Sequence, residues 1–117
     1  MRNFRKYDMW QDSVAFTTDI YKITNTFPSY EKFGLSNQLQ RACVSIAANI
    51  AEGSARISEK EFSHFLQISL GSAFEVETQL IIAHNLNYIQ DGQLETFLQR
   101  LYSIEKRLNE MIHILNR

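Results

Sequence analysis

Residues 35–62 read LSNQLQRACVSIAANIAEGSARISEKEF, and this stretch decides the fold. Its apolar and small residues recur at spacings of three and four, which places them on one stripe of an α-helix: Leu35, Leu39, Ala42, Ile46, Ile50 and Gly53. The following Ser58-Glu59-Lys60-Glu61 matches a capping box, in which the Ser58 hydroxyl accepts a hydrogen bond from the Glu61 amide. We therefore expect one helix to end near Gly53 and a second helix to begin near Ser58.

The same periodicity continues on both sides of this stretch. It predicts four helices, at residues 8–26, 33–56, 59–89 and 92–116. Asp8 is expected to cap the first helix, Pro28 follows its end, and Asp91-Gly92 supplies the last turn. Short connections favour antiparallel neighbours. We therefore expect residues 1–117 to form a single all-α domain, an up-down-up-down antiparallel four-helix bundle.

Composition excludes several classes of protein. The net charge of −1 provides no overall attraction to nucleic acid or anionic lipid. The only cysteine, Cys43, excludes an internal disulfide and a cysteine-based zinc site, and is expected to be a buried packing residue in a cytoplasmic protein. The N-terminal MRNFRKYDMW has no apolar signal region, and no apolar run approaches the roughly 18 residues of a membrane helix. We expect neither export nor a membrane span.

Two of the predicted helices carry more apolar surface than one core needs. Helix 8–26 has a second stripe that includes Trp10, Val14 and Tyr21. Helix 59–89 has a second stripe, Leu70, Phe74, Glu77 and Ile81, roughly 100° from its core seam. Large uncovered apolar patches usually mark an interface. The pattern favours a homo-oligomer; the alternative is a monomer in which these helices are wedged deeply.

Candidate catalytic and metal-binding residues are few. Glu61/His64 and Glu110/His113 have the Glu-x-x-His spacing of di-iron bundles, but a helical wheel turns both pairs away from the core. Arg107 and His113 have the spacing of a loose signature of helical-bundle ribonucleases, yet lie about 120° apart on a helix. We expect no catalytic residues, no metal and no cofactor.

His84 shares a helical stripe with Glu77. An ion pair in the core or at an interface is the expected role of these two residues, and a catalytic dyad is the alternative.

A polar stripe follows the second helix and is the stronger functional candidate. It consists of Arg41, Ser45, Asn49, Glu52 and Arg56, at spacings of 4, 4, 3 and 4. In a structural role, Arg41 and Arg56 pair with Glu52 or Glu75, within the chain or between subunits. In a functional role the stripe is a partner surface, because an arginine fork suits both carboxylate and phosphate.

These residues also carry a resemblance to a known family. The matching positions are Leu35, Gln38, Arg41, Ala42, Ser45, Ile46, Asn49, Ile50, Ala51, Glu52, Gly53, Arg56, Gly71, Ser72 and Glu75. They resemble the four-helix-bundle family of proteins encoded in intervening sequences of bacterial 23S rRNA genes, which is similar to accessory proteins of diversity-generating retroelements. The resemblance implies a ring-like homopentamer and suggests RNA or a nucleoprotein as partner.

The expected function follows from these observations together. We expect a non-enzymatic pentameric binding or scaffolding protein, whose candidate nucleic-acid contacts are Arg2, Arg5 and Lys6, beside Phe4 and Tyr7. A five-fold ring would concentrate these cations, giving an avidity that no single copy has. A protein-only adaptor for a neighbouring gene product is the alternative, and a ribonuclease is a further one.

Overall fold

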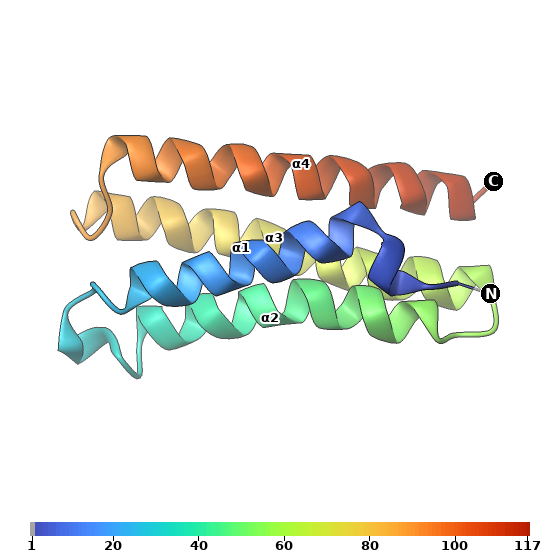
Figure 1. The fold of residues 1–117 in the computed structure, drawn as a ribbon, viewed down its shortest axis with the longest axis horizontal. Coiled ribbons are helices and arrows are strands. Elements are labelled where there is room, and N and C mark those ends of the chain that lie inside the picture. Colours follow the sequence, from blue (N-terminus) through green and yellow to red (C-terminus); the bar gives the residue numbers. More distant parts are fainter. Residues whose placement is uncertain (1) are drawn as a thin grey trace.

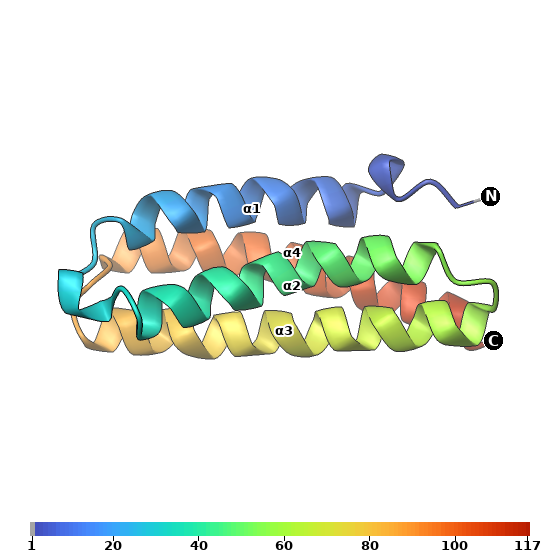
Figure 2. The same ribbon diagram turned by 90° about the horizontal axis from the view of Figure 1, so that it is seen from below.

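The computed structural model describes residues 2–117, which form an antiparallel four-helix bundle (Figure 1). Its elements are η1 (Phe4–Lys6), α1 (Asp8–Thr24), η2 (Ser29–Glu31), α2 (Leu35–Ser54), α3 (Glu59–Asn85) and α4 (Asp91–Leu115). The helices run alternately up and down, so each packs beside its neighbour in the chain, and α1 packs beside α4 (Figures 1 and 2). The predicted all-α bundle is confirmed.

The core lies where the predicted stripes meet. All four helices contribute fully buried side chains, among them Phe16, Ile20, Leu39, Ile46, Phe62, Leu66, Leu80, Leu101 and Leu108. Two ion pairs join α1 to α4 at the edge of this core: Arg100 donates to Asp19 at 2.8 Å, and Arg107 donates to Asp12. No helix among residues 2–117 combines the length and hydropathy that crossing a bilayer requires.

The α2–α3 corner follows the decisive stretch closely. The Glu61 amide donates to the Ser58 hydroxyl at 3.1 Å, which is one of the two bonds of the expected capping box; the return bond from the Ser58 amide to the Glu61 carboxylate is not formed among the described residues. A Cβ atom on Gly53 would lie 2.7 Å from Cβ of Phe65 and 3.0 Å from Cδ1 of Phe62. Real Cβ atoms do not approach so closely. The glycine therefore allows α2 and α3 to pack together at this end of the bundle.

Two helix ends differ from the expectation. Tyr7 is the N-cap of α1, without a side-chain cap, and Asp8 lies in the first turn, so the predicted Asp8 cap is wrong. In the first turn, the negative Asp8 carboxylate still interacts favourably with the positive end of the helix dipole. α3 ends at Asn85 rather than near residue 89. Asn87 has a φ of 64°, and the Tyr88 amide donates to the Ala83 carbonyl at 2.9 Å, which is a Schellman ending.

Candidate functional site

The polar stripe on α2 is partly a structural link to α3. The hydroxyls of Ser45 and Ser72 hydrogen-bond at 2.9 Å, and Asn49 donates from Nδ2 to the Ser45 carbonyl at 2.8 Å and to its hydroxyl at 2.9 Å. One turn deeper, Ser69 donates to the Ile46 carbonyl at 2.8 Å. These bonds satisfy small polar groups where the two helices pack closely. The Ser45–Ser72 and Ser69–Ile46 bonds therefore link α2 to α3, while Asn49 orients Ser45 from within α2.

Arg41 and Glu75 occupy a more open place on the same two helices. They line a hollow of about 590 Å³ together with Gln38, Thr78 and Gln79. Gln79 is buried and donates to Glu75 at 3.4 Å, while its own Oε1 has no hydrogen-bond partner among the described residues. Arg41 is exposed, and no carboxylate of residues 2–117 forms an ion pair with it. The hollow thus exposes an unpaired cation, Arg41, while the unpaired Gln79 acceptor is buried beneath it.

The N-terminal residues dock against the α2–α3 corner. The Arg2 guanidinium lies 4.7 Å from the centroid of the Phe62 ring and donates to the Arg56 carbonyl. Tyr7 stacks on Phe62, with the ring centroids 6.3 Å apart. Arg2 therefore holds this segment in place, whereas Arg5 and Lys6 are exposed.

The same end of the bundle gathers further cations. Arg56 lies with its guanidinium 4.5 Å from the centroid of the Phe65 ring, and not in an ion pair with Glu52 or Glu75. A hollow of about 630 Å³ is lined by Arg56, Lys60 and His64, with the acidic Glu61 also in its lining. We call the cations at this end, Arg2, Arg5, Lys6, Arg56 and Lys60, the basic end. The aromatic rings at this end are covered by guanidinium groups or by one another, so the basic end offers cations to phosphates.

The residues considered for catalysis do not converge. Glu61, His64, Glu110 and His113 are all exposed, as the helical wheel predicts, and Arg107 is engaged by Asp12. Among residues 2–117, no group of three or more His, Cys, Asp or Glu side chains is arranged to hold a metal ion. Cys43 is fully buried, and this burial raises the pKa of its thiol well above the ordinary value. A buried, protonated thiol is a poor nucleophile.

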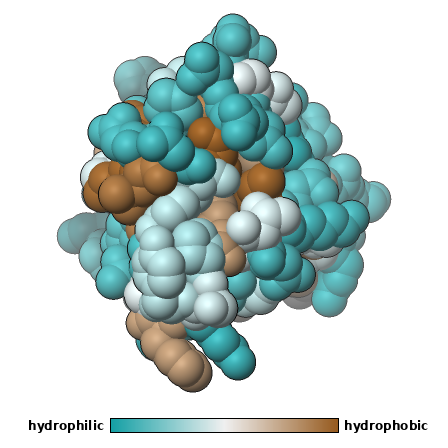
Figure 3. Space-filling model, turned by 90° about the vertical axis from the view of Figure 1, so that its left-hand side faces the viewer, coloured by the Kyte–Doolittle hydropathy of each residue, from teal (hydrophilic) through white to brown (hydrophobic). Residues whose placement is uncertain are grey.

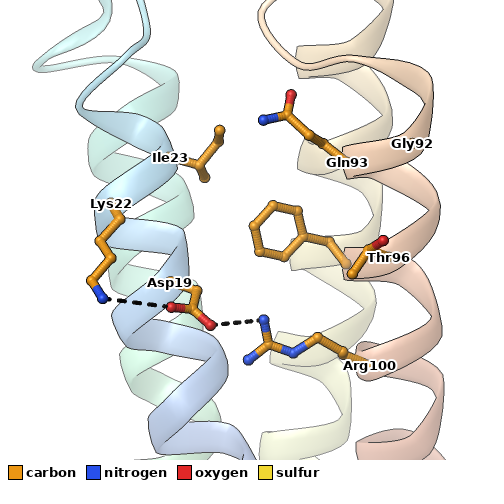
Figure 4. A pocket seen from close by; sticks show the side chains of 8 residues that line it. Asp19, Lys22, Ile23, Gly92, Gln93, Thr96 and Arg100 are labelled. Carbon is orange, nitrogen blue, oxygen red and sulfur yellow. Dashed lines mark hydrogen bonds and ion pairs between the residues drawn. The ribbon is translucent and has the colours of Figure 1, made fainter.

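A further hollow, between α1 and α4, has its charged groups satisfied. It measures about 570 Å³, and Figure 4 shows Asp19 between the side chains of Lys22 and Arg100. Asp19 accepts from Arg100 at 2.8 Å and lies 4.0 Å from the Lys22 ammonium. Because these ion pairs face one another, the hollow offers no unpaired charge to a ligand.

Two acidic contacts between α3 and α4 were not predicted. His84 contacts Asp91, with Nε2 2.6 Å from Oδ1, rather than Glu77. Glu77 instead lies beside Glu105, which is only 9% exposed. Burial, and secondarily the Glu77 carboxyl, raise the pKa of Glu105 to about 7. The sequence signal was a glutamate next to the α4 seam, on the side that faces Glu77.

Comparison with known proteins shows the family of this chain. The family model for the 23S rRNA-intervening sequence protein matches residues 5–110. The chain belongs to this family. Among curated proteins, none matches the chain.

A solved member of the S23 ribosomal protein family is also similar. It is a protein with unknown function from Bacteroides thetaiotaomicron VPI-5482, 29% identical in sequence with a TM-score of 0.83. The match covers 90% of this chain and 95% of that one. Within this chain the polar residues divide into two sets: Ser45 and Ser72 join α2 to α3, while Arg41 and Glu75 line an open hollow.

Proposed function

We propose that this chain is a non-enzymatic scaffold that assembles into a homo-oligomer, a pentamer as the sequence resemblance implies. The observation that carries the proposal is the apolar surface left uncovered on α3. Four large apolar side chains of this helix, Ile68, Phe74, Ile81 and Ile82, are 40% to 51% exposed, and so is its C-cap residue Leu86. Burial of such surface contributes about 25 cal/mol per Å². A second copy would cover what the bundle leaves in water.

The partner proposed for the assembly is RNA or a nucleoprotein, bound at the basic end. Arg5, Lys6 and Lys60 are exposed there beside a hollow that also contains His64. Sequence-independent affinity for RNA comes from cations that neutralise phosphates. A single copy with a net charge of −1 offers few such contacts, and an oligomer multiplies them.

Native mass spectrometry of protein purified without nuclease tests the assembly and its cargo together. An oligomer that carries RNA is the expected result. A monomer at micromolar concentration would refute the scaffold proposal.

Binding to a fluorescently labelled RNA of mixed sequence tests the basic end. The triple variant Arg5→Ala/Lys6→Ala/Lys60→Ala should bind about tenfold more weakly, with a salt slope lower by roughly 0.7 for each phosphate that the variant no longer neutralises. Arg2 and Arg56 stay unchanged because both pack on phenylalanine rings. The control, Lys22→Ala/Lys32→Ala, changes cations away from the basic end. Equal affinity and slope in the triple variant would exclude the basic end as the RNA site.

A protein-only adaptor is the second candidate. At the other end of the bundle, Tyr30 and Phe33 are 77% and 87% exposed in the α1–α2 connection. Figure 3 shows this end, with separate brown apolar patches among teal hydrophilic side chains. Exposed aromatic side chains are enriched at protein interfaces. An oligomer that carries no RNA, and whose partner is lost in Phe33→Ser, would favour this candidate.

A further inference from the structure

Two outer faces of the bundle share α3. The α3–α4 face consists of Phe74, Glu77 and Ile81 from α3, with Tyr102 and Glu105 from α4. The α2–α3 face consists of Arg41 from α2, with Gly71, Gln79 and Ile82 from α3. Each face contains groups that lack a partner within the chain, and these groups differ between the two faces.

The α3–α4 face crowds two carboxyl groups within an apolar surround. Glu105 is 9% exposed, and its Oε2 has no hydrogen-bond partner among the described residues. Its charged neighbour is another carboxyl, that of Glu77, and no cation of residues 2–117 forms an ion pair with either of the two. Phe74 and Tyr102 flank the pair and are 51% and 46% exposed. A neighbouring molecule that supplies a cation and an apolar surface would stabilise this face.

The α2–α3 face has the opposite deficit. Arg41 is exposed and lacks an ion-pair partner in residues 2–117. Gly71 lies in the middle of α3, where a glycine costs about 1 kcal/mol relative to alanine. A Cβ atom at Gly71 would meet nothing within 4 Å. Nothing inside the chain therefore requires this glycine, whereas close approach by another chain would.

The two faces match in height along α3. The hollow around Arg41 is lined by Glu75, Thr78 and Gln79, which places Arg41 level with Glu77. Gly71 lies three residues from Phe74, about 4.5 Å along the axis. Ile82 is adjacent to Ile81 in the chain. Along the axis, the α2–α3 face presents Gly71, then Arg41, then Ile82. The α3–α4 face presents Phe74, then the two carboxyl groups, then Ile81, so complementary groups follow in the same order.

We propose that the α2–α3 face of one copy docks on the α3–α4 face of the next, with Arg41 between the neighbour's Glu77 and Glu105 and the neighbour's Phe74 over Gly71. This inference rests on the proposed self-association and specifies its geometry. The contact is heterologous, because two different faces meet. Because the matching groups lie within one helical turn of the same height, neighbouring copies are related by a rotation with little shift along the axis, and such a contact forms a ring where the rotation closes.

The docking also predicts a pH dependence. A neighbour's Arg41 favours the ionised carboxyl, so assembly releases the proton that Glu105 holds in the single copy. Glu77 is the charged group that α3 places beside Glu105, and His84, two turns along α3, is already held by Asp91. The assembly should therefore strengthen as the pH rises from about 6 to 8.

Variants that disable one face at a time test the proposal by sedimentation velocity. Arg41→Glu removes the cation of the α2–α3 face, and Phe74→Glu places a third acid on the α3–α4 face. Each variant alone should raise the concentration of half-assembly by roughly a hundredfold. Mixed together, they retain one intact face each, so they should form a 1:1 dimer that grows no further. Lys32→Glu, a charge reversal in the α1–α2 connection, is the matched control and should assemble normally.

An uncharged variant and a charge reversal complete the test. Gly71→Leu adds bulk where the single chain has open space, so it should fold normally and fail to assemble. Arg41→Glu/Glu77→Arg in one chain should restore assembly, because Glu77, unlike the buried Glu105, is only half-buried and can carry the reversed charge. A wild-type monomer would refute self-association itself. If the wild type assembles and each of the variants Arg41→Glu, Phe74→Glu and Gly71→Leu assembles equally well, only this interface is refuted. The absence of a dimer in the mixture of Arg41→Glu and Phe74→Glu would also refute it.

Discussion

The effect of a residue on this bundle depends on how much space surrounds its side-chain position. Gly53 and Gly71 are both helical glycines, yet a side chain at Gly53 would collide with Phe65, and one at Gly71 would enter open space. The spacing of small residues predicted that Gly53 belongs to the core stripe, and the structure confirms it. The spacing contained no information about Gly71, because neighbours in space decide what a glycine does there.

At Gly53 we expect a destabilised fold. Gly53→Ala forces Phe62 and Phe65 to shift, which should lower the free energy of unfolding by about 1–3 kcal/mol. Urea unfolding followed by circular dichroism measures this. Gly92→Ala, at a position with nothing within 4 Å, is the control and should leave stability nearly unchanged. A Gly53→Ala protein as stable as the wild type would mean that α2 and α3 separate at little cost.

At Cys43 we expect a thiol that reacts only on unfolding. The side chain is fully buried and its raised pKa keeps it protonated, so little thiolate forms at neutral pH. An aromatic disulfide reagent that releases a coloured thiolate should react slowly with Cys43 in the native protein and rapidly in denaturant. Rapid reaction without denaturant would show that α2 opens locally.

At the scale of whole elements, periodicity predicted which residues form helices better than where the helices end. The buried seam of α3, from Phe62 to Ala83, is the one that the spacing predicts. Its end was misjudged because Ile89 is apolar and buried, so the hydrophobic pattern continues after the helix has stopped. The interruption is a backbone event at Asn87, and only the structure shows it.

The Asn87 ending gives a test with a built-in control. Asn87→Ala should cost about 1 kcal/mol, because a Cβ residue without a side-chain amide disfavours a positive φ. Asn87→Gly should be neutral or slightly stabilising. Thermal unfolding of the two variants measures the difference. Equal stability of both would mean that the α3 ending contributes little.

The α3–α4 pairing predicts how stability varies with pH. Glu105 has a pKa of about 7 when folded and an ordinary value of 4.5, so the folded chain holds the proton more tightly. Stability should therefore be full below about pH 4.5 and fall as the pH rises to about 7.5, by about 3 kcal/mol in all. Glu105→Gln should remove this fall, and Glu110→Gln, at an exposed position of α4, should retain it. Urea unfolding of dilute, monomeric protein at several pH values decides the question.

At the scale of the molecule, the number, order and direction of the helices could be predicted, since short connections leave few arrangements. The candidate sites could be predicted only in part. The α2 stripe was recognised as one set, but its residues divide between internal bonds at Ser45 and Asn49 and an open hollow at Arg41. Glu105 was missed, because its burial depends on how α3 and α4 meet. The residue pattern specifies a helix face but not the face packed against it.

The even number of helices brings both termini to the same end of the bundle (Figure 1). This permits a circular permutant, in which a glycine-serine linker joins residues 117 and 2 and new ends open between Lys32 and Phe33. Exposed connections tolerate such cuts, so the permutant should unfold at a temperature close to that of the wild type. Its new ends would lie away from the basic end. A fluorescent protein attached to them would leave the basic end unobstructed.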